Sequence, residues 1–458
     1  MALLTAILSF ASSAAPETGP IDSNEEPQNY RVTDCEEGQS PCQPLVQCVQ
    51  GRSKCVFRKV YFDVEECAKK EPRQKCLNFS ERLSEVTLVT DSYNFISAPL
   101  SKPKVKAEIV SDTLKVPWDI EFLPDGSLLA TEKEGKLKHI TPDGKSTELL
   151  SLDVITTHEA GLMGLAIDPD FADNGFVYAA YTYKLDDTDP AFAKPKMWTH
   201  QRVLNKVSRW TFRDGKLQDE TLILDGLPGS VEHCGLRIEF GADGKLYVST
   251  GDATRWHQSQ DMDFLGGKIL RANADGTIPH DNPDPKSYVY SRGHRNPQGM
   301  AWDQAGEMYA SEHGPQRFDE INRIVPGGNY GWGSYKCDTK MAKHAKPEDR
   351  RFPVVCFRHW NLSPSGMTFV TDPASPWYGS LFVAGLRGKH LHRYKFDDKR
   401  KDELVENEIF YVSDGWDYKK PGIEGQLSRR LRDVEYFGGA LYVIGDTFGL
   451  VKLTPLDN

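Results

Sequence analysis

The chain has 458 residues, enough for one large β architecture or for two or three average domains. Its net charge of −10 argues against nucleic acid and anionic membrane surfaces as partners, because both are negatively charged themselves. After residue 15 no apolar stretch is long enough to span a membrane. The many glycine, proline and aromatic residues favour short strands joined by turns, so we expect a mostly β protein.

The first residues have the pattern of a secretory signal peptide. Residues 1–15 are mostly apolar and end in small residues, although no cationic residue precedes the apolar run. We therefore expect a signal peptide over residues 1–15 and a secreted, extracellular protein. The alternative is an apolar tail without a targeting role.

Six cysteines follow within about forty residues, and none of them forms the C-x2-C pair of a zinc site. They predict a small disulfide-rich module over residues 30–80, which needs an oxidising compartment. Two N-glycosylation sequons begin at Asn78 and Asn361, although Pro364 follows the second. Residues 81–104 indicate a linker. The six cysteines are Cys35, Cys42, Cys48, Cys55, Cys67 and Cys76.

One pattern recurs over residues 105–456: a turn that contains glycine, followed by alternating apolar residues. Such a segment predicts a hairpin strand. Six copies, about 63 residues apart on average, predict a six-bladed β-propeller with long loop insertions. The alternative is an open β-sandwich with chance similarity. A propeller would bring loops from different blades together at a central channel. The turn glycines are Gly126, Gly175, Gly244, Gly306, Gly379 and Gly439.

Polar residues gather immediately before several of these hairpins. His233 precedes the Gly244 hairpin, and a lone histidine is more often structural than catalytic. Arg295 and Asn296 precede the Gly306 hairpin, where a guanidinium and an amide can orient an anionic, carbonyl-rich ligand. Arg430 and Arg432 lie on one face of an extended segment and predict an anion site, unless Asp433 or another carboxylate neutralises them. Arg387 is a weaker candidate of the same kind.

Oxygen donors gather in residues 312–315, 319–322 and 327–332. Carboxylates and backbone carbonyls together are compatible with Ca²⁺, whereas the alternative is an ordinary solvated acidic loop. The sequence has no Walker loop, no Rossmann fingerprint and no G-x-S-x-G elbow. Nicotinamide, nucleotide triphosphate and serine-hydrolase chemistry therefore have no supporting motif.

Taken in order, these segments resemble the soluble glucose/sorbosone and aldose sugar dehydrogenases that depend on pyrroloquinoline quinone (PQQ), a family of six-bladed propellers. The resemblance covers roughly residues 105–455. The ordered set is far more specific than any one of its members. Its motifs are VPWDIEFLPDGSLLATE, GLMGLAIDPDF, EHCGLR, FGADGKLYVSTGD, GGKILRANADGTIP, RGHRNPQGMAW, EHGPQRFDEINRIVPGGNYGW, SPSGM and RRLRDV.

The resemblance implies two catalytic residues, His233 and Arg295. His233 would take the hydroxyl proton of an aldose while hydride passes to a PQQ carbonyl, and Arg295 with Asn296 would hold the reactive side of the cofactor. The anomeric C–OH would become a lactone, and an external acceptor would take the electrons. Arg430 and Arg432 would bind the PQQ carboxylates.

The resemblance also implies further cofactor residues and two calcium ions. Arg387 stands where the family often has lysine or a neutral residue, and Glu159 where it has glutamine or glutamate. One Ca²⁺ would bridge the cofactor to the carbonyls of Gly314 and Pro315. A structural Ca²⁺ would use Glu320 and the carbonyl of Tyr330.

The sequence departs from the family pattern beside the base. Leu236 replaces a common second glycine, so we expect it to narrow the cofactor shelf, and Glu232 replaces a smaller polar residue. Cys337 and Cys356 enclose an insertion and predict a loop-closing disulfide, which leaves Cys234 as a free thiol. That thiol is either a buried filler or a group at the cofactor shelf.

Two other functions remain open at this stage. One is a non-catalytic extracellular propeller that binds a protein or a sugar, which the added cysteine module would suit. The other is a calcium-dependent propeller hydrolase, which would need carboxylates and amides that converge on a metal in the channel.

Overall fold

A computed structural model describes residues 105–185, 203–337, 349–357, 362–399, 401, 403–410, 430–446 and 449–456, together with the backbone of several short strands elsewhere. The chain divides into two units, Met1–Leu88 and Val89–Asn458. In the first, strands β1 (Asn29–Tyr30), β2 (Leu45–Cys48) and β3 (Cys55–Arg58) form an antiparallel sheet in that order. The predicted signal peptide, the pairing of the six cysteines and the asparagines of both sequons lie outside the described residues, and the domain boundaries stay a prediction.

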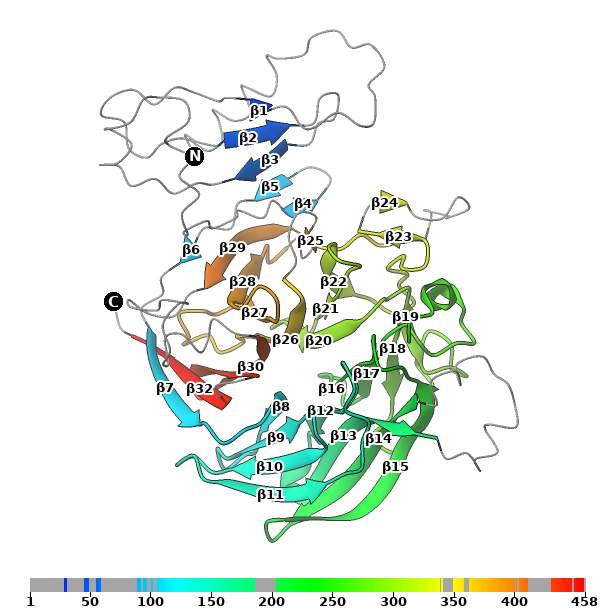
Figure 1. Ribbon diagram of the computed structural model, residues 1–458, viewed down its shortest axis with the longest axis vertical. Helices are drawn as coiled ribbons and strands as arrows, with labels where there is room; N and C mark the ends of the chain where they lie inside the picture. The colour runs from blue at the N-terminus through cyan, green and yellow to red at the C-terminus, as the bar shows by residue number, and fades with distance from the viewer. Residues whose placement is uncertain are drawn as a thin grey trace. The chain divides into compact units, whose positions relative to one another are not determined.

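The second unit is built from six antiparallel sheets, which Figure 1 shows as blades around a centre. Blade 1 consists of β8 (Pro117–Phe122), β9 (Leu128–Glu132), β10 (Lys136–Ile140) and β11 (Ser146–Ser151). Blade 2 consists of β12 (Leu162–Ile167), β13 (Phe176–Lys184), β14 (Val203–Arg213) and β15 (Lys216–Pro228). Blade 3 consists of β16 (Gly235–Phe240), β17 (Leu246–Thr250), β18 (Lys268–Ala272) and β19 (Val289–Arg292).

The remaining three blades follow in chain order. Blade 4 consists of β20 (Pro297–Trp302), β21 (Met308–Glu312), β22 (Asp319–Ile324) and β25 (Val355–Phe357). Blade 5 consists of β26 (Pro364–Phe369), β27 (Ser380–Gly385), β28 (Leu391–Phe396) and β29 (Leu404–Phe410), with β6 (Leu100–Ser101) added in parallel. Blade 6 consists of β30 (Leu431–Phe437), β31 (Ala440–Gly445), β32 (Gly449–Pro455) and β7 (Val105–Ser111).

Several short elements lie outside the six main sheets. They are the hairpins of β4 (Val89–Asp91) with β5 (Asn94–Ile96) and of β23 (Tyr335–Lys336) with β24 (Thr339–Lys340), the helical turn α3 (Phe171–Asn174) and the 3₁₀ helix η3 (Trp256–Gln260). Among the described residues no helix is long and apolar enough to cross a membrane.

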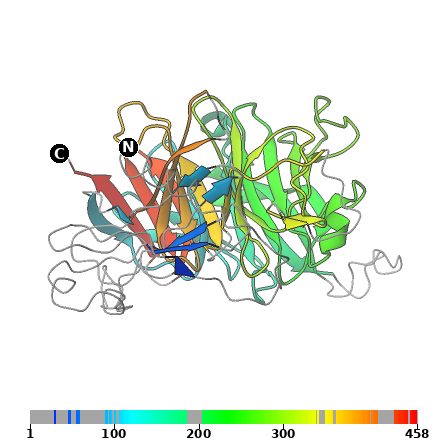
Figure 2. The ribbon, with the colours of Figure 1, turned by 90° about the horizontal axis from the view of Figure 1, so that it is seen from above.

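The first strand of each blade lies next to the first strand of the following blade, and β30 contacts β8, so the ring is closed. The prediction of a six-bladed β-propeller is therefore confirmed. Strand β7 precedes blade 1 in the chain but pairs with β32 of blade 6, which joins the two ends of the propeller. Figure 2 shows the ring from its edge, with the strands of the blades running between its two faces.

The six repeated glycines are explained by backbone conformation. All of them lie in turns between the first two strands of a blade and have φ between 68° and 83°. A side chain is disfavoured in this left-handed region, whereas glycine enters it without steric cost. The recurring glycine thus marks the turn between the first two strands of each blade.

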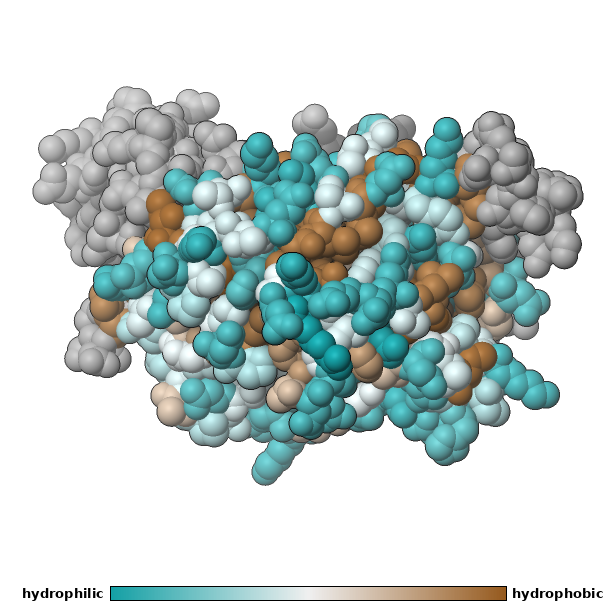
Figure 3. Space-filling view, turned by 90° about the horizontal axis from the view of Figure 1, so that it is seen from below, coloured by the Kyte–Doolittle hydropathy of each residue, from teal (hydrophilic) through white to brown (hydrophobic). Residues whose placement is uncertain are grey.

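The core lies mostly between neighbouring blades. The inner strands are buried, and one hydrophobic cluster joins blades 2 and 3 while another joins blades 5 and 6. The outer edge of blades 1 and 2 faces the viewer in Figure 3 and is mostly hydrophilic, with apolar residues gathered near its middle. The ring is therefore held by apolar packing between blades and not by the outer surface.

A buried ion cluster links the inner strands of three blades. Arg237 of blade 3 reaches Asp119 of blade 1 and lies 3.4 Å from Asp433 of blade 6, and each side chain is 1% exposed. Two residues further along each of the same three strands lies a glutamate: Glu121, Glu239 and Glu435. Burial, followed by repulsion from neighbouring carboxylates, raises the pKa of all three glutamates well above the ordinary range. This cluster forms the floor of the site described next.

Candidate active site

The predicted site residues lie at one end of the channel. His233 and Arg295 immediately precede β16 and β20, and Arg430 precedes β30. These strands are the innermost strands of blades 3, 4 and 6 and begin at the same end of the channel, which we call the channel mouth. The fold thus gathers residues that are far apart in the sequence.

His233 is held between an acid and a guanidinium. Its Nδ1 lies 2.7 Å from Oδ1 of Asp252, and its Nε2 lies 2.7 Å from Nη2 of Arg295. A carboxylate only accepts hydrogen bonds, so Nδ1 carries the proton; a guanidinium only donates, so Nε2 accepts a hydrogen bond from Arg295. The ring is 17% exposed, whereas Asp252 is 1% exposed. This is the arrangement of an oriented general base.

Asp252 is itself fixed by two donors. Its Oδ2 accepts a hydrogen bond of 2.7 Å from the indole of Trp332, and its Oδ1 accepts one of 2.8 Å from the backbone N–H of Thr254. His233 has φ of 56°, a strained value for a non-glycine residue. The surrounding hydrogen bonds therefore impose the position of the imidazole.

Arg295 is held on several sides. Its Nη1 donates to the carbonyl of His313 at 3.1 Å, its backbone N–H donates to Glu312 at 2.7 Å, and its guanidinium lies 5.5 Å from the ring of Trp332. Its Nη2 donates to Nε2 of His233 at 2.7 Å, so a fixed cation lies next to the base.

Glu159 and Asn296 connect three blades behind the base. One carboxylate oxygen of Glu159 accepts from the backbone N–H of His233 at 2.9 Å and from the amide of Asn296 at 3.0 Å. The Asn296 oxygen accepts from Gly235 and Gln298, both at 3.0 Å. Asn296 is fully buried, so its side chain positions the loops of blades 2, 3 and 4.

The two arginines of blade 6 share one acid. Arg430 and Arg432 both pair with Asp446, and the guanidinium of Arg432 lies 4.6 Å from the ring of Trp118. The neutralising carboxylate is thus Asp446 and not Asp433, which belongs to the Arg237 cluster. Arg387 is exposed, and no ion pair involves it within the described part of the chain.

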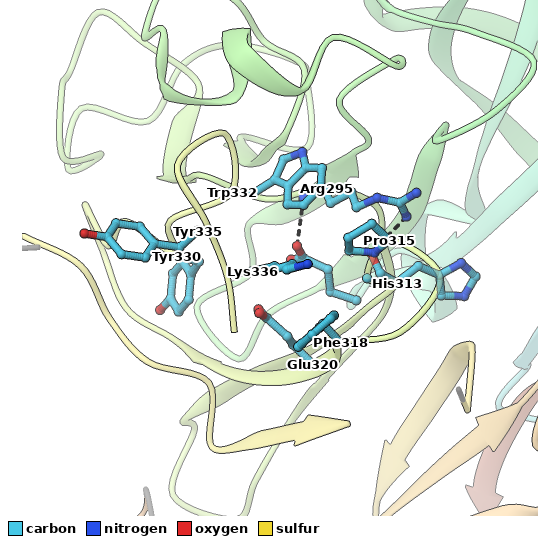
Figure 4. Close-up of a pocket in the computed structure, with 11 residues that line it drawn as sticks. Arg295, His313, Pro315, Phe318, Glu320, Tyr330, Trp332, Tyr335 and Lys336 are labelled. Atoms are coloured by element: carbon cyan, nitrogen blue, oxygen red, sulfur yellow. Dashed lines mark hydrogen bonds between the residues drawn. The ribbon is translucent and has the colours of Figure 1, made fainter. Parts of the chain in front are cut away.

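The proposed calcium ligands surround one pocket, which Gly314, Pro315, Glu320 and Tyr330 line together with Arg295 and Trp332 (Figure 4). Burial, followed by repulsion from Glu312, raises the pKa of Glu320 to about 8. Oδ1 of Asn322 is buried without a hydrogen-bond partner among the described residues, while its amide donates to Glu320 at 3.1 Å.

These oxygens fit a hard cation, but few of them belong to acidic side chains. The described residues contain no group of three or more His, Cys, Asp or Glu side chains that could hold a metal ion. The Pro315 carbonyl already accepts from the backbone N–H of Arg317 at 2.6 Å. A calcium ion here would therefore depend mainly on backbone and amide oxygens.

The cysteine prediction is confirmed where the structure describes it. Cys337 and Cys356 form a disulfide, and Cys234 is free and buried. Burial raises the pKa of the Cys234 thiol well above its usual range, and its sulfur lies 3.0 Å from the carbonyl of Ser230. Cys234 is thus the buried filler and not an accessible nucleophile.

The expectation for Leu236 is wrong. Leu236 is fully buried in the hydrophobic cluster between blades 2 and 3, together with Cys234, so it does not narrow the cofactor shelf. Its φ of 64° turns the backbone and directs the side chain into the core. Glu232 is exposed and lies 3.7 Å from His158.

The sequence did not reveal four site residues: Lys133, Asp252, Trp332 and Asp446. Asp252 follows the end of β17, which is the strand paired with β16, and this pairing was the available signal. Lys133 lies near the arginines of blade 6; burial, followed by repulsion from Arg432, lowers its pKa. The other two residues carried no local signal.

Comparison with known proteins identifies the family. The sequence profile of the glucose/sorbosone dehydrogenase family matches residues 114–451. Quinoprotein glucose dehydrogenase B of Acinetobacter calcoaceticus is 33% identical over 367 residues, which are 70% of this chain and 74% of that protein. An aldose sugar dehydrogenase of Escherichia coli is 31% identical over 374 residues, 77% of this chain and 93% of that protein.

A solved structure agrees with these relatives. The PQQ-bound form of an aldose sugar dehydrogenase from Streptomyces coelicolor superposes with a TM-score of 0.62 at 31% identity, and covers 78% of this chain and 99% of its own. The chain therefore belongs to the glucose/sorbosone dehydrogenase family. The resemblance inferred from the ordered motifs is confirmed.

Proposed function

We propose that the protein is a PQQ-dependent sugar dehydrogenase that oxidises the anomeric C–OH of an aldose to a lactone and passes the electrons to an external acceptor. The observation that carries this proposal is the arrangement of His233, whose Nδ1 proton is held by Asp252 and whose Nε2 accepts a hydrogen bond from Arg295. The quinoprotein relative and the PQQ-bound structural neighbour support the choice of cofactor.

The residues of this chain have distinct tasks in such a reaction. PQQ, when bound, supplies the quinone carbonyl that accepts the hydride. Nε2 of His233 removes the sugar hydroxyl proton, and Asp252 stabilises the imidazolium that results. Arg295, which contacts Nε2 directly, is placed to donate hydrogen bonds to a polarised oxygen beside the base.

The donors at the channel mouth fit the cofactor. Arg295, Arg430 and Arg432 provide guanidinium groups for a planar ligand with several carboxylates. For Ca²⁺ we propose the carbonyls of Gly314 and Pro315 and, for a structural ion, Glu320 with the Tyr330 carbonyl. Gly314, Pro315, Glu320 and Tyr330 all line one pocket, which supports a cation there.

We also propose that the protein is secreted. The disulfide between Cys337 and Cys356 supports an oxidising compartment, since cytosolic reductants keep most thiols reduced.

The alternative of a non-catalytic binding module has weaker support. Hedgehog-interacting protein of Homo sapiens is 26% identical over 321 residues, which are 65% of this chain but 43% of that protein. A binding surface does not need a histidine whose tautomer is fixed by a buried acid. The His233–Asp252–Arg295 arrangement therefore favours the enzyme.

The test is reconstitution with PQQ and Ca²⁺, followed by addition of an aldose while the cofactor absorbance is recorded. We expect a cofactor band that changes on addition of sugar. His233→Ala should keep PQQ binding and lower kcat by about 10²–10⁴, the range of a lost general base. The control is His280→Ala, because His280 is exposed. Wild-type turnover in His233→Ala with PQQ saturating would reject the assignment.

A further inference from the structure

One carboxylate occupies the arginine pair of blade 6. Asp446 follows the end of β31, and its backbone N–H donates to the Arg430 carbonyl at 3.1 Å, which fixes it beside the first residues of β30. Its Oδ1 accepts from Nε of Arg432 at 2.5 Å, and its Oδ2 lies 3.0 Å from Nε of Arg430 and 3.3 Å from Nη2 of Arg432.

The contacts with Asp446 use one edge of each guanidinium. Within the described residues, no hydrogen bond or ion pair involves Nη1 of Arg432 or either Nη of Arg430, so these N–H groups are available to a ligand. Arg430 is 51% exposed, whereas Arg432 is 9% exposed and lies over Trp118. Arg430 and Arg432 therefore have N–H donors left for a ligand, although both already pair with the Asp446 carboxylate.

We propose that Asp446 is a built-in counter-anion of the cofactor clamp, which weakens the binding of a polycarboxylate ligand and so keeps that ligand exchangeable. The identity of the ligand as PQQ rests on the proposed function; the role of Asp446 follows from its position between the two arginines. The ligand class is a small molecule with two or more carboxylates.

Two opposing effects of Asp446 have to be weighed. It holds the arginines in place, which favours binding, and it repels any second carboxylate brought to the same guanidiniums, which disfavours binding. Arg432 is also held by contacts other than Asp446, because Trp118 packs against it and the side chain is nearly buried. Repulsion between two carboxylates that share one arginine pair is strong in a partly buried site, since screening by water is reduced. The repulsion therefore dominates.

The surrounding charges support this balance. Burial, followed by repulsion from Arg432, lowers the pKa of Lys133, and Asp446 acts in the opposite direction. Asp446 thus neutralises part of the positive charge that Lys133, Arg430 and Arg432 carry together. Removal of its charge leaves that group more positive toward an incoming anion.

The experiment is Asp446→Asn, which preserves the shape of the side chain and removes its charge. The dissociation constants of PQQ and of citrate, a tricarboxylate that needs no redox chemistry, are measured by titration calorimetry at low and at moderate salt. We expect roughly tenfold tighter binding of both ligands, equal to about 1.4 kcal/mol, and a steeper dependence on salt. Asp446→Glu keeps the charge and should bind like the wild type.

The control is Asp281→Asn, which removes the same charge from an ion pair with Arg271 in blade 3 and should leave both affinities unchanged. General damage to the fold would weaken binding, so tighter binding is specific to the proposed role. Citrate affinity in folded Asp446→Asn that does not exceed the wild-type value would overturn the proposal. A different outcome would reject only the proposed function: the wild type does not bind PQQ, but Asp446→Asn still binds citrate more tightly than the wild type does.

Discussion

At the scale of single residues, the geometry of the base depends on Asp252. The carboxylate accepts from three donors at once: the His233 ring, the Thr254 backbone and the Trp332 indole. An amide has one accepting oxygen, so Asp252→Asn turns an N–H toward either Trp332 or His233. In both orientations the histidine loses its fixed tautomer or the buried indole loses its acceptor.

We expect Asp252→Asn to lower kcat by about 10²–10³ while PQQ affinity changes by less than about threefold. Steady-state kinetics at saturating PQQ, combined with a PQQ titration, measure both quantities. The matched control is Asp243→Asn, which removes a carboxylate bound to Arg271 in blade 3. A kcat within a factor of about two of the wild type would show that Asp252 does not orient the base.

Lys268 is a second residue whose burial has a measurable consequence. Its ammonium is fully buried and donates to the carbonyls of Ser259 and Gly266, both at 2.9 Å. Burial lowers the pKa of Lys268 from 10.5 to about 7. The unfolded chain therefore binds more protons than the folded chain between about pH 7 and pH 10.5, and stability is lost as the pH falls through this window.

We expect the free energy of unfolding of the wild type to rise by about 2 kcal/mol more than that of Lys268→Met between about pH 7 and pH 9. Urea unfolding at both pH values gives the difference. Lys106→Met, at a side chain that is 60% exposed, should follow the wild-type profile. Identical pH profiles of Lys268→Met and the wild type would mean that Lys268 titrates normally in the folded protein.

At the scale of structural elements, the inner strands of blades 1, 3 and 6 are tied together by Arg237. Its Nε also donates to the Gln298 carbonyl of blade 4 at 3.0 Å. Gly366 of blade 5 leaves the space that this cluster needs, since a Cβ there would lie 1.6 Å from Oδ1 of Asp433. Leu165 of blade 2 donates its backbone N–H to Oδ2 of Asp119 at 2.8 Å, so all six blades contribute to this cluster.

Arg237→Met leaves Asp119 and Asp433 buried without their cation, so we expect a loss of about 3–5 kcal/mol in the free energy of unfolding. Denaturant unfolding provides the measurement. Arg292→Met serves as the control, because its partner Asp349 is 53% exposed and the expected loss is about 1 kcal/mol or less. Equal losses in the two variants would show that the channel cluster does not join the blades.

At the scale of the whole molecule, the proposed ligand would bridge the ring. Its contacts would come from blades 3, 4 and 6, while β7 pairs with β32 to hold the ring closed. A ligand that binds only the folded state stabilises it, and at one hundred times the dissociation constant the gain is about 2.7 kcal/mol.

We therefore expect PQQ with Ca²⁺ to raise the melting temperature by a few degrees, in a single transition. Differential scanning fluorimetry with increasing PQQ gives the shift. NAD⁺ is the control ligand and should give none, because the sequence has no dinucleotide-binding fingerprint. Equal shifts with both ligands, or none with PQQ, would contradict the assignment of the cofactor.

The sequence by itself determined the blade count and the loops that carry chemistry. The six turn glycines have positive φ, and period-two patterning depends only on neighbouring residues, so both signals are local. The position of His233 and Arg295 just before such hairpins was also visible in the sequence, whereas their proposed catalytic roles came from the resemblance to the family. The disulfide of Cys337 and Cys356 was also predictable from its position around an insertion.

Only the tertiary structure decided which side chains face one another. Asp252 is 19 residues from His233, Arg295 is 62 residues from it, and the Asp433 carboxylate bonds a backbone N–H 313 residues away. Leu236 is buried in the cluster between blades 2 and 3 and not at the cofactor shelf, which no local pattern indicated. Ring closure sets these relations, because it places the starts of all inner strands around one axis regardless of their separation in the chain.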